Sequence, residues 1–289
     1  MDFSAFLRDV TAEGRVLRGA EVWRDGRLLH SWGDTEETPY ELYSVTKSVL
    51  SVALGVAWDR GLIDFGRPLA AYLPPESLRA LPPAQRGIWE TMPLRRLMTM
   101  SVEGLPFRPE GENWLDFSLR VPVPRPERAV FHYSNLNAFL AGVALTRAAG
   151  QDAGTFIADN VLGPLGITDC SFTRSPEGYF YGASGMRMRV RDLSRIGLML
   201  CAGGLWEGKR ILSETYIREA AAPLQMNREG GYGYFFWKAP GGFAMHGKFK
   251  QRCFVLPSRG LVITWLADID DPSAFMEEAM ARHLLGPSD

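Results

Sequence analysis

The sequence lacks the features that would direct a chain to a membrane or stabilise it in an oxidising compartment. Residues 1–10 contain neither the basic stretch nor the apolar core of a secretion signal, and no apolar run is long enough to span a bilayer. Only three cysteines occur, an odd number at wide spacing, which predicts free thiols at Cys170, Cys201 and Cys253. We therefore expect a cytoplasmic protein with no membrane partner.

An excess of charge of either sign is also missing. Lys and Arg number 32 against 33 Asp and Glu, so the net charge is -1. A chain this balanced has no overall field that would attract a polyanion. We expect no nucleic-acid partner.

Motifs for metals and nucleotides are absent as well. There is no His-Glu-x-x-His and no Cys-x-x-Cys, and the four histidines are scattered. Residues 203–210 and 242–249 resemble a phosphate-binding loop but lack the Ser or Thr that would hold magnesium. The stretch 182–186 does not match the Gly-x-Ser-x-Gly nucleophile elbow of the α/β-hydrolases, because its fifth residue is Met186 and not glycine. We expect no metal and no cofactor.

The elements that are present are typical of a globular protein of 289 residues, 46% of them apolar and 22% charged. Alternating patterns near both ends predict strands, whereas residues 62–180 are rich in proline and show almost no alternation. The apolar segment 44–60 predicts a buried helix that stops at Gly61. The other predictions are a helix at 3–12, strands at 16–23, 27–32, 233–237, 243–246, 252–256 and 261–266, helices at 135–149, 192–201 and 213–221, and a last helix that Asp271 and Pro272 begin and that runs to Leu285.

Together these elements predict an α+β fold. An antiparallel β-sheet is flanked by N- and C-terminal helices, and an all-helical domain is inserted in the middle of the chain. We assign residues 1–65 and 182–289 to the sheet domain and residues 66–181 to the helical domain. The cleft between the two domains is where we expect the active site.

The first candidate for chemistry is Ser44-Val45-Thr46-Lys47, at the start of the apolar helix. Residues three apart share a helix face, so the Lys47 amine can reach the Ser44 hydroxyl. Burial and the positive end of the helix dipole both favour a neutral amine, which could serve as the base for a serine nucleophile. The Ser44 amide could also stabilise an oxyanion. This spacing arises by chance about 0.3 times in such a chain, and the alternative is a helix-terminal serine beside a lysine that reaches the surface.

A second motif, Tyr133-Ser134-Asn135, directly precedes another predicted helix. The Tyr133 phenol could exchange protons with the nucleophile and the leaving group. The Asn135 amide could hold either Lys47 or a substrate carbonyl. For Tyr133 the alternative is an ordinary turn-and-cap sequence.

A third motif, Met245-His246-Gly247, lies on a predicted strand. A glycine there would let the backbone approach a ligand closely, and the amide of Lys248 could complete an oxyanion hole with that of Ser44. A glycine that ends a strand is also common at bulges and turns. Asn135, His246, Gly247 and Lys248 are therefore our candidate substrate-binding residues.

In this order, the three motifs resemble those of the serine β-lactamase and penicillin-binding-protein superfamily. The similarity is greatest to its class C-like branch of esterases, D-amino-acid peptidases and 6-aminohexanoate-oligomer hydrolases. Residues 94–105 resemble the family's LLTHTSGL segment, 131–135 its F-x-Y-S-N, and 164–167 its PLGM. The resemblance implies that Ser44 is the acylated nucleophile, that Lys47 and Tyr133 transfer protons, and that Asn135 is a substrate-side amide.

The third motif departs from the family pattern. Met245-His246-Gly247 stands where penicillin-recognising members carry Lys-Thr/Ser-Gly, so the usual anchor for a β-lactam carboxylate is missing, although Lys248, Lys250 or Arg252 could replace it. We therefore expect a serine hydrolase that forms an acyl-enzyme on a small-molecule ester or amide, as an esterase or amidase does. The alternatives are a β-lactamase or D-alanyl-D-alanine carboxypeptidase, and a catalytically silent homologue that binds a ligand.

Overall fold

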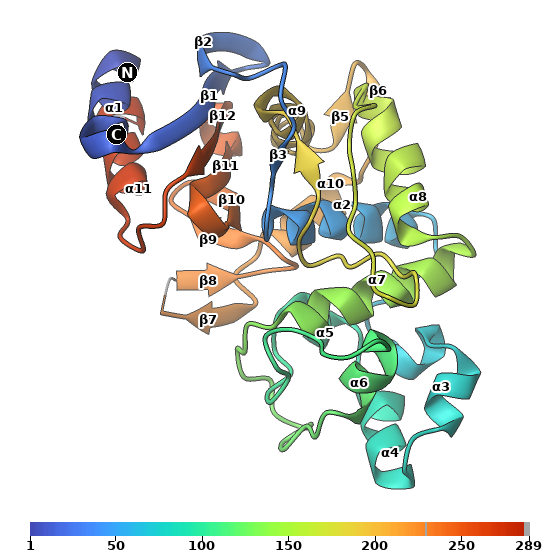
Figure 1. Cartoon of the computed structure of the whole chain (residues 1–289). Coiled ribbons are helices and arrows are strands. Elements are labelled where there is room, and N and C mark those ends of the chain that lie inside the picture. Colours follow the sequence, from blue (N-terminus) through green and yellow to red (C-terminus); the bar gives the residue numbers. More distant parts are fainter. Residues whose placement is uncertain (229, 286–289) are drawn as a thin grey trace.

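An eight-stranded antiparallel β-sheet is the central element of the computed structural model, which describes residues 1–228 and 230–285 (Figure 1). Its strand order is β2-β1-β12-β11-β10-β9-β8-β7. The strands are β1 (Val16–Arg24), β2 (Arg27–Gly33), β7 (Gln225–Asn227), β8 (Gly230–Tyr232), β9 (Trp237–Ala239), β10 (Gly242–Gly247), β11 (Gln251–Leu256) and β12 (Leu261–Asp268).

Both ends of the chain meet in this sheet. β1 and β2 form a hairpin around Asp25 and Gly26, which take φ values of 49° and 74°, as a tight two-residue turn requires. β12 pairs with β1 along its length, with Arg24 opposite Leu261. The N-terminal hairpin therefore forms one edge of a sheet that is otherwise built from the last third of the chain.

Helices cover both faces of the sheet (Figure 1). On one face lie α1 (Phe3–Val10) and α11 (Phe275–Met280), whose apolar side chains share a buried cluster with Phe254 and Trp265. On the other face α9 (Val190–Cys201) packs against β11 and β12. Since side chains alternate along a strand, neighbouring residues of β11 and β12 contribute to two separate clusters, one on each side of the sheet.

The helix α2 (Val45–Asp59) lies in the middle of the second cluster. Every one of its residues from 45 to 57 is buried, as its apolar sequence predicts. Two of its few polar side chains bond to a neighbouring turn: the Ser48 hydroxyl donates to the Phe235 carbonyl at 2.7 Å and the Ser51 hydroxyl to the Tyr234 carbonyl at 2.6 Å. These bonds satisfy hydroxyls that would otherwise be costly to bury.

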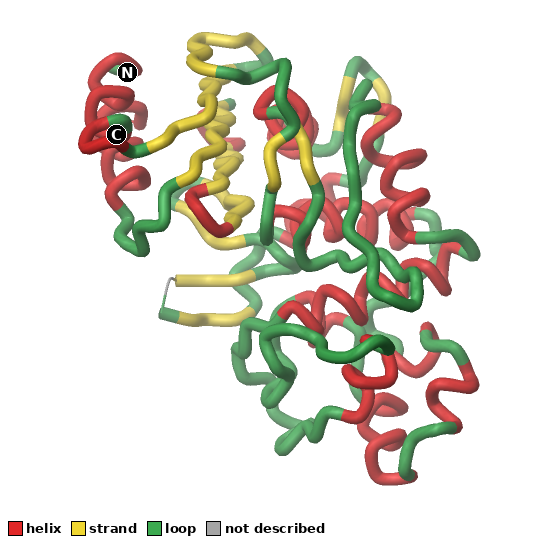
Figure 2. Tube along the Cα trace, viewed as in Figure 1, coloured by secondary structure: helices red, strands yellow, loops and turns green. Residues whose placement is uncertain are grey.

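The middle of the chain is helical (Figure 2). The structure describes all of residues 66–181 and assigns no β-strand among them. α7 packs on α2, and one hydrophobic cluster runs through both, so the helical part shares a continuous core with the sheet. The helices are α3 (Pro75–Arg79), α4 (Pro83–Thr91), α5 (Arg95–Met98), α6 (Trp114–Arg120), α7 (Asn135–Ala149) and α8 (Ala153–Ile157).

The predicted α+β fold is confirmed, while the domain limits at residues 66 and 181 stay a prediction. The remaining elements are small. They are the pair β3 (Tyr40–Glu41) and β4 (Arg187–Met188), the pair β5 (Leu205–Trp206) and β6 (Lys209–Arg210), and the helix α10 (Glu214–Ala220).

Two predicted elements were wrong. The stretch 233–236 forms a turn and the strand begins only at Trp237, because Phe235 takes a left-handed φ of 59° and its amide bonds to the Met98 carbonyl instead of to a neighbouring strand. The last helix begins at Phe275, because the Asp271 carboxylate accepts the amide of Ser273 in a local turn and caps no helix. At Phe235 a distant contact overrode the strand pattern, whereas at Asp271 a local turn took the place of the helix cap.

The packing of α2 predicts opposite outcomes for two helical glycines. A Cβ at Gly55 of α2 would lie 2.4 Å from the buried ring of Tyr216, whereas a Cβ at Gly87 of α4 would meet nothing within 4 Å. Gly55→Ala should therefore lower the free energy of unfolding by about 1–3 kcal/mol through overpacking. Gly87→Ala should raise it by up to about 1 kcal/mol through helix propensity. Denaturant unfolding measures both, and equal effects of the two substitutions would contradict this packing.

Candidate active site

Ser44 lies at the N-terminus of α2 with its side chain free of the usual capping role. It has helical backbone angles, φ -70° and ψ -6°, and makes no side-chain cap bond. The residue before it, Tyr43, takes a left-handed φ of 48°, which is costly for a bulky side chain. Such strain is common where a fold must present one particular side chain. Here it turns the chain sharply into α2 so that the Ser44 hydroxyl meets Lys47.

The Lys47 amine is surrounded by three oxygen atoms. Its Nζ lies 2.9 Å from Ser44 Oγ, 2.8 Å from Asn135 Oδ1 and 2.8 Å from the Ala183 carbonyl oxygen. Only 1% of the residue is exposed. Burial lowers the pKa of Lys47 to about 7, since water no longer stabilises the ammonium. The alternative in which this lysine reaches the surface is wrong.

The identities of the three oxygens define the role of each contact. Asn135 Oδ1 and the Ala183 carbonyl can only accept hydrogen bonds. A neutral amine donates its two N–H groups to them, and its lone pair then faces the Ser44 hydroxyl, which can donate. Such an arrangement is suited to a general base beside a nucleophile.

Asn135 is fixed from both sides. It begins α7, whose N-cap Ser134 accepts the Leu136 amide and donates its hydroxyl to the Pro106 carbonyl. While Asn135 Oδ1 faces Lys47, Asn135 Nδ2 donates to the Tyr181 hydroxyl at 3.0 Å. Of the two roles predicted for Asn135, the structure shows the one in which it holds Lys47.

Tyr133 lies next to the same amine. Its ring centroid is 5.0 Å from Lys47 Nζ, and the ring stacks on Trp237 with centroids 5.8 Å apart. Further aromatic side chains surround it, namely Phe107, Phe131 and Tyr232. The structure therefore places both Ser44 and Tyr133 next to Lys47, from two segments about 90 residues apart in the sequence.

A cavity of about 460 Å³ opens over the serine. Three of the predicted site residues, Ser44, Asn135 and Lys248, line it. The others that line it were missed by sequence analysis, since no motif marks them: Glu41, Tyr43, Phe107, Arg108, Pro109, Trp114, Thr173, Tyr181, Ser184 and Gly185. Glu41, Arg108 and Lys248 supply charges of both signs around Ser44.

The third motif lies partly outside this cavity. His246 does not line the cavity over Ser44. The His246 ring stacks on Trp237 with centroids 5.6 Å apart, and Trp237 therefore contacts both His246 and Tyr133. His246 instead lines a separate cavity of about 830 Å³ beside α11, and burial holds its pKa well below the usual value. Its predicted contact with substrate has no support from this position.

A glycine is required at position 247 because two backbone segments pack closely there. A Cβ at Gly247 would lie 2.3 Å from the Leu42 carbonyl oxygen. The end of β10 therefore presses on the segment just before Ser44, and the next residue, Lys248, reaches the cavity.

Among the three basic residues considered as carboxylate anchors, only Lys248 lines the cavity. Lys250 instead donates to the Ser273 carbonyl, and Arg252 pairs with Glu277.

Neither a metal centre nor a membrane-spanning helix is found in the described part of the chain. Within residues 1–228 and 230–285, no group of three or more His, Cys, Asp or Glu side chains is placed to hold a metal ion. No helix in the same residues is long and apolar enough to cross a bilayer.

Comparisons with known proteins identify the fold and the family of this chain. The solved structures with similar folds include a proposed 6-aminohexanoate-dimer hydrolase from Bacillus anthracis, with a TM-score of 0.78, 16% identity, and coverage of 98% of this chain and 80% of that one. They also include SurE with D-Leu, with a TM-score of 0.75, 20% identity, and coverage of 96% of this chain and 73% of that one. A class C beta-lactamase from Rhodobacter sphaeroides has a TM-score of 0.76, 16% identity, and coverage of 98% of this chain and 99% of that one. At these identities the likeness shows the fold. The family model named Beta-lactamase matches residues 6–286, and the chain therefore belongs to the beta-lactamase family.

Proposed function

We propose that this protein is a serine hydrolase that forms an acyl-enzyme on an ester or amide. The observation that carries this proposal is the buried Lys47 amine, which contacts the Ser44 hydroxyl and two oxygens that can only accept. A structural lysine would be expected to pair with a carboxylate or reach water. A lysine in these surroundings is suited to take a proton from serine.

In the proposed first step, Lys47 removes the Ser44 proton while Ser44 Oγ bonds to the substrate carbonyl carbon. The amides of Ser44 and Lys248 stabilise the oxyanion. The bond to the leaving group then breaks, and this group takes the proton back from Lys47 or through Tyr133. In the second step, water adds to the acyl carbon and gives a proton to Lys47, the Ser44 ester bond breaks as Ser44 Oγ takes that proton back, and the acid is released. Proton and electron counts balance without a cofactor.

A second candidate function is a β-lactamase or D-alanyl-D-alanine carboxypeptidase. The observation in its favour is that Lys248 and Arg108 line the cavity, so a carboxylate anchor is present without the Lys-Thr-Gly motif. A cytoplasmic location, which we also propose, would disfavour the carboxypeptidase, since peptidoglycan cross-links lie outside that compartment. Rapid opening of the chromogenic β-lactam nitrocefin would favour the second candidate over an esterase.

The nucleophile assignment predicts the behaviour of Ser44→Ala. Because Ser44 carries the hydroxyl that Lys47 Nζ contacts, its removal should lower hydrolysis of p-nitrophenyl esters by about a thousandfold or more. Intact-mass spectrometry should show a fluorophosphonate adduct on the wild type and on the control Ser258→Ala. This control removes the exposed hydroxyl of Ser258 in the turn after β11. An adduct on Ser44→Ala would contradict the assignment, and no adduct on any of the three would favour a catalytically silent homologue.

The low pKa of Lys47 predicts a specific pH dependence. Below a pH of about 7 the amine binds a proton and can no longer accept the one from Ser44. We therefore expect kcat/KM for an uncharged ester to rise tenfold per pH unit up to about pH 7 and then to level off. A profile measured between pH 5 and 9 tests this. A flat profile, or one that still rises at pH 9, is inconsistent with Lys47 as the base.

The position of Tyr133 predicts a loss of rate without a loss of structure. Tyr133→Phe keeps the ring that packs on Trp237 but removes the proton-transferring hydroxyl, so acylation should slow by about 10²–10⁴-fold. The control is Tyr179→Phe, a phenol that packs on Phe139 away from the cavity. Stopped-flow measurement of the acylation burst separates the two variants. Equal burst rates in Tyr133→Phe and the wild type would remove Tyr133 from the mechanism.

A further inference from the structure

The Asn135 amide that faces Lys47 has a second partner, the hydroxyl of Tyr181. Asn135 Nδ2 donates to this hydroxyl at 3.0 Å, while Asn135 Oδ1 accepts from Lys47 Nζ at 2.8 Å. Tyr181 is only 8% exposed, and it lines the cavity over Ser44. The proposed acyl transfer gives Tyr181 no role. A buried hydroxyl that bonds directly to the group holding the base is a candidate for a positioning residue.

The orientation of the Asn135 amide decides what the Lys47 lone pair can do. With Oδ1 toward Lys47, the amine donates to Oδ1 and to the Ala183 carbonyl, and its lone pair is left for the Ser44 hydroxyl. With Nδ2 in that place, the amide would donate to the lone pair, and the amine could no longer accept the Ser44 proton. The two orientations have nearly the same shape, so hydrogen-bond partners must select one of them.

The Tyr181 hydroxyl is suited to select the productive orientation. Its oxygen accepts from Asn135 Nδ2, which has no other hydrogen-bond partner in the described part of the chain. Without the hydroxyl, Nδ2 would be a buried donor with no acceptor, whereas an unpaired buried carbonyl oxygen is tolerated more often. Loss of the hydroxyl therefore favours the rotated amide, in which Nδ2 donates to Lys47.

The Tyr181 ring is held by packing that does not depend on its hydroxyl. Its centroid lies 5.0 Å from that of Trp114 and 6.5 Å from that of Phe139. The next residue, Gly182, has a φ of 70° and passes close to α7, where a Cβ would lie 2.9 Å from the Ala138 carbonyl oxygen. A phenylalanine at position 181 can keep the same ring contacts and the same backbone path.

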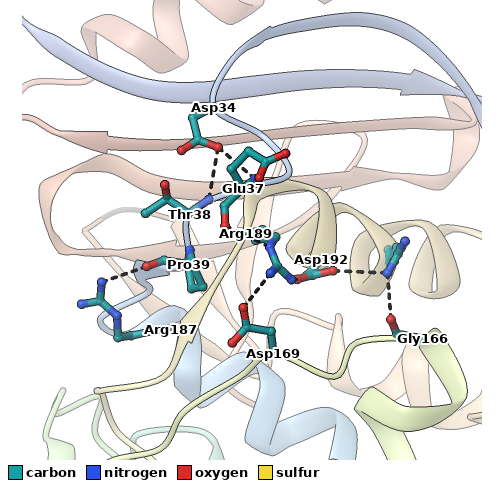
Figure 3. Close-up of polar contacts among 10 residues, drawn as sticks. Asp34, Glu37, Thr38, Pro39, Gly166, Asp169, Arg187, Arg189 and Asp192 are labelled. Carbon is teal, nitrogen blue, oxygen red and sulfur yellow. Dashed lines mark hydrogen bonds and ion pairs between the residues drawn. The ribbon is translucent and has the colours of Figure 1, made fainter.

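The segment that follows Tyr181 is anchored to the segment that leads into α2. β4 pairs with β3, and the Leu42 amide donates to the Met186 carbonyl at 2.8 Å. Figure 3 shows a further bond between these two segments, from the Arg187 guanidinium to the Pro39 carbonyl at 2.8 Å. None of these bonds involves the Tyr181 hydroxyl, so the backbone should stay in place when the hydroxyl is removed.

We infer that Tyr181 is a positioning residue, whose hydroxyl keeps Asn135 Oδ1 directed at Lys47 and thereby keeps the Lys47 lone pair free for the Ser44 proton. This inference rests on the proposed serine hydrolase function and adds to it a residue that belongs to no motif. Tyr181 acts through Asn135 and does not itself transfer a proton.

The test measures how fast Ser44 reacts with an uncharged fluorophosphonate between pH 5 and 9, by intact-mass spectrometry. Each protein molecule reacts once, so slow variants can be followed for hours. In Tyr181→Phe the plateau rate constant should fall about tenfold, because fewer molecules have the productive amide. The midpoint should also move to lower pH by about half a unit or more, because a rotated amide no longer accepts from the Lys47 ammonium and so destabilises it.

The shift in midpoint separates positioning from a merely structural role. A general loss of structure would lower the plateau and leave the midpoint where it is. The matched control is Tyr179→Phe, which removes a phenol that packs on the same Phe139 ring and does not line the cavity. It should keep the wild-type plateau and midpoint. Both substitutions leave in place the other titratable groups around Lys47, which are Tyr133, Glu41, Arg108 and Lys248.

A double-mutant cycle tests whether Tyr181 acts through Asn135. In the Asn135→Ala background the amide is gone, so Tyr181→Phe should change the rate constant by less than about twofold. Melting curves show which variants are folded. If Tyr181→Phe is not folded, Tyr181→Met carries the same prediction, because it also lacks the hydroxyl and its flexible side chain fills the space.

The outcomes distinguish this inference from the function on which it rests. If wild-type Ser44 reacts with a midpoint near pH 7 and Tyr181→Phe has the same plateau or the same midpoint, the inference is wrong and the hydrolase stands. An equal loss of rate with and without the Asn135 side chain would also overturn it, because the hydroxyl would then act directly. If wild-type Ser44 does not react at all, both are wrong.

Discussion

The burial of one amine is the constraint on which the rest of the site depends. Lys47 is withdrawn from water by the packing of α2 and meets two carbonyl-type oxygens and one hydroxyl. An ammonium in this position would lose most of its hydration, so the site favours the neutral form and leaves a lone pair directed at Ser44. The chemistry proposed for the protein follows from this balance between desolvation and hydrogen bonding.

The fold supplies the three oxygens from three distant parts of the chain. Ser44 comes from the start of α2, Asn135 from the start of α7, and Ala183 from the segment that leads back toward the sheet. They can meet because α2 and α7 belong to one hydrophobic core shared by the sheet and the helical region. The same core carries Trp237, whose ring contacts Tyr133 on the side of the site and His246 on the side of α11. Trp237 therefore links the proposed catalytic site to the packing beside α11.

Sequence reasoning was sufficient where the determinants are local. The spacing of Ser44 and Lys47, the N-terminal hairpin and the helix at 135–149 all depend on residues within one element, and the structure shows each of them. It failed where distant contacts decide the outcome, as at Phe235, whose amide bonds to Met98. The same limit explains the cavity lining: Glu41, Arg108 and Tyr181 belong to no motif, and only the folded chain places them around Ser44. Conversely, His246 belongs to a recognisable motif, yet its ring lies outside the cavity because alternate residues of β10 face different ways.

The central claim, that Lys47 is a neutral amine near physiological pH, can be tested without any substrate. The chain has five lysines, so a protein labelled with ¹⁵N in its lysine side chains gives few signals, and single substitutions of the other four assign that of Lys47. The account predicts that the Lys47 Nζ signal titrates with a midpoint near pH 7. A Lys47 signal that remains that of an ammonium up to pH 9 would contradict the account.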